Sequence, residues 1–233
     1  MKKIAILQSN YIPCKGYFDI INMVDEFVLY DDAQYTKNDW RNRNIVKTFS
    51  GPQWLTIPVV TKGRITHEQR IIETEVISSQ WCKKHWKTIQ YNYAKAAHFE
   101  LYADKISELY RKCEDERFLS NINHLFLTEI CNILGISTKI TWSSQYRLGE
   151  GKTEKIINIC KQSDANQYIS GPAAKNYINP QLFSDANISL IYMDYSGYKQ
   201  YPQLHGKFIH EVSILDMLFN LGSQTICYMK SFH

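Results

Sequence analysis

The sequence predicts an α/β fold with a Rossmann-like, mostly parallel sheet that has helices on both faces and a helical insertion. Unbroken apolar runs at residues 4–7 and 27–30 are typical of strands that are buried on both faces. The residues between them, 17–24, carry apolar side chains at helical spacing. Such a strand–helix–strand unit has a right-handed crossover, so we expect parallel strands whose polar ends share one edge of the sheet.

The alternation of strands and helices returns in the C-terminal half. A strand signal at 54–60 contains Pro58, which indicates that the strand stops there or lies at an edge, and residues 63–75 stay unassigned. Further strands are expected at residues 137–142, 167–170 and 188–193. Further helices are expected at residues 153–160, 173–177 and 211–221.

Residues 79–135 predict a helical lobe inserted into the α/β core. This stretch is rich in good helix formers, and Gly135 suits the end of a helix. The three helices are expected near residues 80–95, 98–112 and 117–134. Because no repeat or flexible linker divides the chain, we expect one domain over residues 1–233.

Composition argues against several classes of protein. The formal net charge is only +4 with scattered cations, which gives no support to a nucleic-acid binder. Six cysteines stand far apart without a CxxC pair, which favours free thiols in the cytoplasm and no metal site. No apolar stretch approaches the roughly 20 residues that span a bilayer, so we expect no membrane insertion.

The loop after the first strand is the first candidate for ligand binding. In open α/β sheets, ligands lie beyond the carboxyl ends of the strands, where helix N-termini offer unpaired N–H groups. The alternative is a plain capping turn. The candidate residues of this loop are Gln8, Ser9, Asn10, Tyr11, Gly16 and Tyr17.

The segment 31–44 is the densest in polar function. It holds three carboxylates, three cations, four amides and two aromatic residues directly after a buried strand. Carboxylates there can act as a base, and arginines can clamp phosphate oxygens. The alternatives are a solvated loop, or an Asp31 or Asp32 that pairs with an arginine to fix the loop. The candidates are Asp31, Asp32, Gln34, Tyr35, Lys37, Trp40, Arg41, Asn42, Arg43 and Asn44.

Three later segments add candidates. Lys152 and Thr153 begin a helix, and residues 168–177 read as strand, turn and helix, although simple helix caps explain both locally. Residues 198–213 contain His205 and His210, either of which can act as a base near neutral pH, with Asp216 placed to orient His210. The remaining candidates are Ser170, Gly171, Lys175, Tyr201 and Gln203.

Several of these strings together resemble one known family. QSNYIPCKGYFDIIN, FVLYDDAQYTKNDWRNRN, YISGPAAKNYI and YPQLHGKFIHEVSILDMLFNLG are similar in order and wording to the WbqC-like family over essentially the whole chain. That family occurs with genes for lipopolysaccharide O-antigen synthesis, and its members are described as acyl- or glycine-transferases. The resemblance therefore implies a bacterial enzyme of surface-polysaccharide synthesis.

We expect an acyl- or aminoacyl-transferase that acts on the amine of a nucleotide-linked or lipid-linked amino sugar. Asp32 or His210 would serve as the base, and Gln8, Asn42 and the backbone at 170–171 would polarise the carbonyl. A phosphate clamp is assigned to Lys37, Arg41, Arg43 and Lys175. The sequence leaves open the donor, which is a thioester or an ATP-activated acid, and the oligomeric state. The alternative function is a non-catalytic nucleotide-sugar-binding or glycan-assembly protein.

Overall fold

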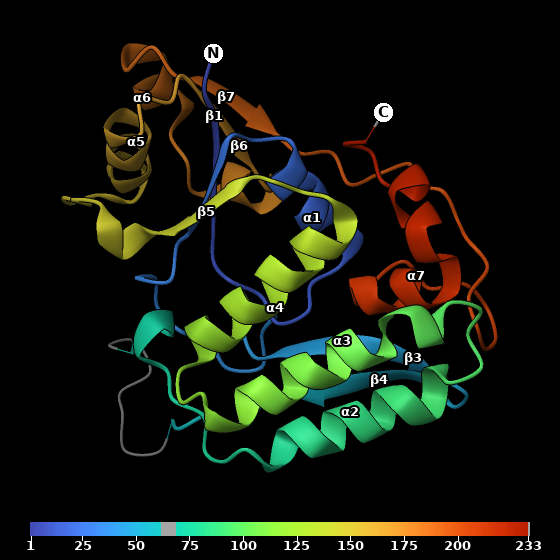
Figure 1. Cartoon of the computed structure of the whole chain (residues 1–233). Coiled ribbons are helices and arrows are strands. Elements are labelled where there is room, and N and C mark those ends of the chain that lie inside the picture. Colours follow the sequence, from blue (N-terminus) through green and yellow to red (C-terminus); the bar gives the residue numbers. More distant parts are fainter. Residues whose placement is uncertain (62–68, 233) are drawn as a thin grey trace.

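The core of the protein is a five-stranded sheet in which every pair of neighbouring strands is parallel. The computed structural model describes residues 1–61 and 69–232, and Figure 1 shows how its elements are arranged. The sheet has the order β5-β2-β1-β6-β7. Its strands are β1 (Lys3–Leu7), β2 (Glu26–Leu29), β5 (Lys139–Trp142), β6 (Gln167–Ser170) and β7 (Ser189–Tyr192).

The strand order creates a topological switch point between β1 and β6. From β1 the chain moves to β2 and then to β5 on one side, whereas β6 and β7 lie on the other side. Loops that leave the carboxyl ends of two such strands diverge, and the crevice between them is where ligands of open α/β folds bind. The Rossmann-like, mostly parallel sheet expected from the sequence is therefore confirmed.

Helices cover both faces of the sheet. Alternate strand residues point to opposite faces: Ala5 and Phe27 belong to one apolar cluster, and Ile4 and Val28 to the other. The first cluster includes side chains of α1 (Lys15–Asn22) and α4 (Leu119–Leu134), and the second includes those of α5 (Lys152–Gln162) and α6 (Pro180–Asp185).

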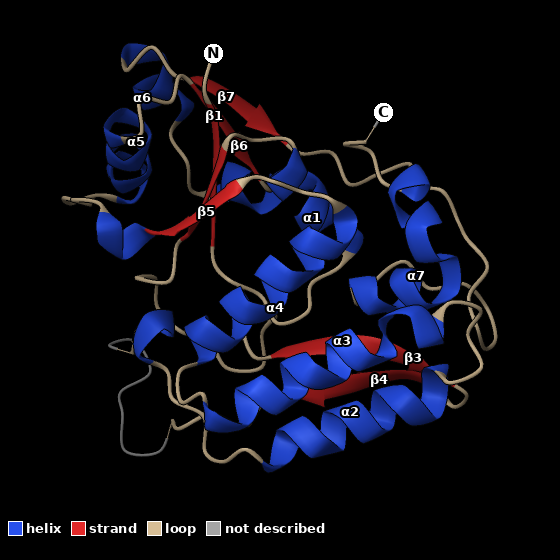
Figure 2. Cartoon of the chain, viewed as in Figure 1, coloured by secondary structure: helices blue, strands red, loops and turns tan. Residues whose placement is uncertain are grey.

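A second, two-stranded sheet lies apart from the first and is packed against helices (Figure 2). Its strands β3 (Arg43–Thr48) and β4 (Gly51–Thr56) form an antiparallel hairpin. The sequence prediction missed β3 and placed the following strand at 54–60, too late. Helices α2 (Gln80–Tyr93) and α7 (Ile214–Leu221) pack against β3, and α3 (Phe99–Lys112) packs against both of these helices.

Other elements differ from expectation at their ends. The short helix expected at 173–177 is a 3₁₀ helix, Pro172–Asn176, and α6 was not expected. The last helix begins at Ile214, not at residue 211, because the Ser213 side chain accepts from the backbone N–H of Leu215 and caps it there. Of the unassigned residues 63–75, those numbered 63–68 lie outside the described residues, and Ile71–Glu73 is a 3₁₀ turn. The other 3₁₀ segments are Cys113–Asp115, Ser143–Gln145 and Gly222–Tyr228.

Candidate functional site

The carboxyl ends of three neighbouring strands meet at one pocket, as their parallel arrangement predicts. Gln8 follows β1, Tyr30 follows β2 and Ser170 ends β6, and all three line a pocket of about 690 Å³ at the switch point. We call it the basic pocket. Its lining consists of Ile6, Leu7, Gln8, Asn10, Tyr17, Tyr30, Arg41, Gly151, Lys152, Lys155, Ile156, Ser170, Gly171, Ala173, Ala174 and Tyr177.

Three cations face the basic pocket from two directions. Arg41 comes from the loop before the hairpin, whereas Lys152 and Lys155 stand in the first turns of α5. Helix α5 has no side-chain cap hydrogen bond at its start, and the acidic residue of its first turn, Glu154, does not line this pocket. The arrangement can bind phosphate oxygens. Sequence analysis missed Lys155, although it lies three residues after the candidate Lys152 and so on the same helix face.

The Arg41 side chain has two polar contacts and still has a hydrogen-bond donor without a partner among the described residues. It donates a hydrogen bond to the side-chain oxygen of Asn10, and its nearest carboxylate, Asp39, lies 3.5 Å away. Its Nε atom is buried without a hydrogen-bond partner among the described residues. A buried donor of this kind carries a desolvation cost unless a ligand or water meets it. Arg41 therefore retains capacity for an anion in the pocket.

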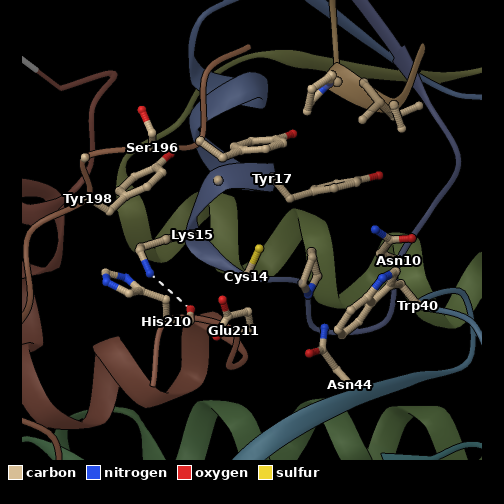
Figure 3. A pocket seen from close by; sticks show the side chains of 18 residues that line it. Asn10, Cys14, Lys15, Tyr17, Trp40, Asn44, Ser196, Tyr198, His210 and Glu211 are labelled. Carbon is tan, nitrogen blue, oxygen red and sulfur yellow. Dashed lines mark hydrogen bonds between the residues drawn. The ribbon is translucent and has the colours of Figure 1, made fainter. Parts of the chain in front are cut away.

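A second pocket, of about 650 Å³, adjoins the first. We call it the aromatic pocket, because Tyr17, Trp40, Tyr195 and Tyr198 line it. Figure 3 shows Tyr17, Trp40 and Tyr198 around the pocket. The two pockets share the lining residues Leu7, Asn10, Tyr17, Gly171 and Ala173, so they adjoin one another, and we call the two together the cleft. The other lining residues of the aromatic pocket are Pro13, Cys14, Lys15, Gly16, Asn44, Pro172, Ser196, Gly197, His210 and Glu211.

Titratable groups gather at one end of the aromatic pocket. Figure 3 shows Cys14, Lys15, His210 and Glu211 together there, and the Lys15 ammonium donates to the backbone oxygen of His210 at 3.2 Å. Burial lowers the pKa of Lys15. Burial, aided by the charge of Lys15, also lowers the pKa of His210, so its imidazole is neutral at pH 7. A neutral imidazole is the form that accepts a proton.

A buried carboxylate holds the first two loops together beneath the cleft. Asp31 accepts from the backbone N–H of Ser9 at 2.8 Å and from the hydroxyl of Ser120. The Asn123 amide donates to the Ser9 hydroxyl and to the backbone oxygen of Arg41, each at 2.9 Å. Burial raises the pKa of Asp31 despite these hydrogen bonds. Ser9 and Asp31, expected to bind substrate, hydrogen-bond to each other and to residues of α4, and neither lines a pocket.

Asn44 supports the loop before α1 from the hairpin side. Its amide donates to the backbone oxygens of Tyr11 at 2.9 Å and Ile12 at 3.1 Å. Ile12 has a φ of 35°, a conformation that costs energy for a β-branched residue and persists only where neighbours enforce it. Asn44 lines the aromatic pocket and at the same time holds the strained loop that leads to Lys15 and Gly16.

Three residues expected to act in the chemistry have structural partners outside the two pockets. Asp32 accepts from Arg70 at 2.9 Å and from the Ser143 hydroxyl at 2.7 Å, which fixes the loop after β2. Asn42 is buried and donates to the backbone oxygen of Ile57 at 2.9 Å. Arg43 stacks 4.1 Å from the Trp54 ring centre, because the strand pleat turns it away from the cleft.

Four further candidates belong to the packing of the protein. Tyr11 is fully buried, and its hydroxyl contacts the Tyr110 hydroxyl and the Nδ1 atom of His85. Tyr35 is likewise buried. Tyr201 donates to the buried Asp216 at 2.7 Å, and Gln203 accepts from Lys47 at 2.8 Å. Asp216, expected to orient His210, accepts instead from the hydroxyls of Tyr201 and Tyr93.

The remaining candidates that do not line either pocket lie at a helix start or on the surface. The Thr153 hydroxyl accepts from the backbone N–H of Asn179 at 3.0 Å, which ties α5 to the segment before α6. Lys175 is exposed, with its ammonium 5.1 Å from the Tyr192 ring centre. Gln34 and Lys37 are also exposed and do not line either pocket. Within residues 1–61 and 69–232, no three His, Cys, Asp or Glu side chains are grouped as metal ligands would be.

Comparisons with known proteins place the chain in a family. It is 48% identical over 230 residues to "Uncharacterized protein Rv1507c" of Mycobacterium tuberculosis (strain ATCC 25618 / H37Rv), across 99% of this chain and 98% of the relative. No solved structure matches it. The helices of the described part of the chain include none with the length and apolar character to cross a bilayer. The family model that matches residues 8–228 covers all the loops around the cleft, and the chain belongs to the WbqC-like protein family.

Proposed function

We propose that the protein is a transferase that joins an acyl or aminoacyl group to the amine of an amino sugar carried on a nucleoside diphosphate. The observation that carries this proposal is the pair of adjoining pockets at the switch point, one basic and one aromatic. A sugar linked to a nucleoside diphosphate has the same division, with a charged part next to a ring. The resemblance to the WbqC-like family adds a role in surface-glycan synthesis, including that of O-antigen.

The diphosphate is assigned to the basic pocket. Arg41 offers a planar guanidinium with a buried, unfilled Nε donor, and Lys152 and Lys155 stand across from it on α5. No ion pair joins Lys152 or Lys155 to a carboxylate of the described residues. Cations without such partners suit phosphate oxygens.

The sugar is assigned to the aromatic pocket. Trp40 and Tyr195 are each 39% exposed, so their rings are accessible to stack on the apolar face of a sugar. Asn10 lies at the junction of the two pockets, where its amide can meet a hydroxyl. This placement puts the sugar between the phosphates and His210.

His210 is assigned as the general base, because Asp32, the other candidate, pairs with Arg70 outside the cleft. The amine nitrogen of the sugar attacks the donor carbonyl carbon, a C–N bond forms, and the nitrogen gives its proton to His210. The leaving group then departs from the carbon with the electron pair of its bond. The backbone at Gly171 lines both pockets and is assigned to the developing oxyanion. Gln8 lines the basic pocket and not the aromatic one, on the phosphate side of the sugar, so it is not assigned to this role. A thioester and an ATP-activated acid both satisfy this scheme as donors.

The test is turnover of UDP- and dTDP-linked amino sugars with a panel of acyl and aminoacyl donors, with products identified by mass spectrometry. The proposal expects an N-acylated sugar nucleotide, and H210N is expected to lower kcat by roughly 10²–10⁴ while sugar-nucleotide binding persists. His205 bonds to the backbone oxygen of Asn92 at 2.8 Å and lies outside both pockets, so H205N is the matched control. Binding without product for every donor would instead favour the non-catalytic nucleotide-sugar-binding role.

A further inference from the structure

Lys15 presents a buried ammonium to the aromatic pocket. The residue is 5% exposed and lines the pocket at its first helical position in α1. Among the described residues its Nζ atom has one hydrogen-bond acceptor, the backbone oxygen of His210 at 3.2 Å. Its other near contact is the face of the Tyr198 ring, 5.1 Å away at the centroid.

This ammonium has no carboxylate partner among the described residues, although a buried ammonium normally has one. An ammonium has three donors, and buried charges are paired or fully hydrogen-bonded because desolvation is otherwise costly. No carboxylate of the described residues lies within 4.0 Å of the Lys15 ammonium, although Glu211 lines the same pocket. A ligand anion would complete the contacts of this side chain.

The start of α1 faces the same pocket and favours the same charge. Cys14 supplies no side-chain cap, and the first turn contains no acidic residue. The first N–H groups of a helix have no partner within the helix, and they attract anions. Gly16 lets the Tyr195 ring of the pocket wall pack closely on the start of α1, because a Cβ atom at this position would lie 2.8 Å from that ring.

We propose that Lys15 and the first turn of α1 form a carboxylate-binding subsite within the aromatic pocket. A single negative charge fits better than a phosphate, since Lys15 is the one Lys or Arg among the described residues of this pocket and Glu211 adds an opposing charge. The phosphates have their own cations in the basic pocket. The inference rests on the proposed function for its context: the carboxylate belongs either to an acidic sugar or to the incoming group.

The direct test measures acylation of Lys15 in the wild-type protein by an amine-reactive reagent, mapped by peptide mass spectrometry. The probes are matched pairs, propionate with propionamide and glucuronate with glucose. Each carboxylate that binds is expected to slow acylation of Lys15 about threefold at twice its Kd, because it shields the amine and favours its protonated form. The neutral partners should have no effect.

Lys230 is the matched internal control. Its ammonium lies 5.0 Å from the centroid of the same Tyr198 ring, but it donates to the backbone oxygen of Asp194 and does not line the pocket. Its acylation should be the same with every probe. Equal slowing of Lys15 and Lys230 would mean a general effect of salt, and unchanged acylation of Lys15 with all carboxylates would overturn the subsite.

Calorimetry then identifies the source of the carboxylate. UDP-glucuronic acid should bind about tenfold more tightly than UDP-glucose if the sugar carries it. K15M should lose this preference, K15R should retain part of it and K230M should keep it, with melts to confirm folding. Protection of Lys15 by propionate, without a preference for UDP-glucuronic acid over UDP-glucose, assigns the carboxylate to the incoming group.

The outcomes separate the two proposals. Binding of UDP-glucose with no carboxylate effect in either experiment overturns the subsite and leaves the proposed function standing. Protection of Lys15 by carboxylates without binding of any UDP-sugar supports the subsite and contradicts the proposed function. A carboxylate preference that survives in K15M also overturns the assignment to Lys15.

Discussion

Arg41 donates a hydrogen bond to the side-chain oxygen of Asn10, and this contact joins the loop that precedes the hairpin to the loop after β1. Asn10 lines both pockets, whereas Arg41 lines the basic one. The contact therefore lies where the phosphate and the sugar of a bound sugar nucleotide would meet. A change at Arg41 should affect the ligand more than the fold, because the residue has few other partners.

Arg41→Ala is expected to weaken binding of a sugar nucleotide about tenfold or more, the effect of one lost charge-assisted contact. Arg43→Ala is the control, since Arg43 stacks on Trp54 and does not line either pocket. Calorimetry measures binding and thermal melts measure folding. A loss of ~3 kcal/mol or more in the stability of Arg41→Ala would make Arg41 a structural residue instead.

Gly16→Ala is expected to impair the aromatic pocket with little loss of stability. The added Cβ would lie 2.8 Å from two atoms of the Tyr195 ring, and that ring is 39% exposed and can turn away. Ligand affinity should fall because one wall of the pocket has moved. In the Tyr195→Ala background, Gly16→Ala should cause almost no further loss of ligand affinity, because the ring that the Cβ would meet is absent. Additive losses of affinity would refute the clash as the cause.

Asn44→Ala is expected to lower the free energy of unfolding by about 1–3 kcal/mol, because two backbone oxygens, those of Tyr11 and Ile12, lose their donor. Asn44→Asp keeps the size of the side chain but also lacks the donor, so it should behave similarly. Urea unfolding measures both variants. Wild-type stability in either would show that Asn44 does not hold the strained Ile12 loop.

Glu26 should make stability depend on pH in the acid range. Burial opposes its ionisation, but hydrogen bonds from Lys2, Tyr146 and Lys139 together lower the pKa of Glu26 from 4.5 to about 2. Because the folded pKa is the lower one, the stabilisation is complete above about pH 4.5 and is lost as pH falls toward 2.

The size of this effect is bounded by solvent screening. A shift of this size corresponds to about 3 kcal/mol at most. Lys2 and Lys139 are 37% and 68% exposed, so about 1–2 kcal/mol is expected. Urea unfolding at pH 6 and pH 3 should show a smaller loss for Glu26→Gln than for the wild type, with exposed Glu100→Gln as the charge-matched control. Equal losses in Glu26→Gln and the wild type would disprove the assignment.

Local patterns were sufficient to predict the sheet and much of the cleft wall. The apolar run before Gln8 marks a strand covered on both faces, and parallel strands bring their carboxyl ends to one edge. Asn10, Gly16, Tyr17 and Arg41 follow from that argument, and each lines a pocket. Strand β3 was missed because its residues mix charged, amide and apolar side chains without a long apolar run.

The residues that sequence reasoning missed depend on distant parts of the chain. Lys15 is buried because Tyr198 and His210, nearly two hundred residues later, cover it. Asp31 was expected at the site, but its carboxylate oxygens accept hydrogen bonds from Ser9 and Ser120 and do not face a pocket. Neither the burial of Lys15 nor the hydrogen bonds to Asp31 produce a periodic pattern in the sequence, because both are tertiary contacts. The single-domain organisation stays a prediction.

The most direct test of the cleft assignment is calorimetry of the pure protein with UDP-glucosamine and with free glucosamine, at low and at moderate salt. The account predicts at least a tenfold preference for the sugar nucleotide, because Arg41, Lys152 and Lys155 contact its phosphates, and the preference should fall as salt rises. Equal affinity for the two ligands, or a preference that salt does not change, would contradict a phosphate site in the basic pocket.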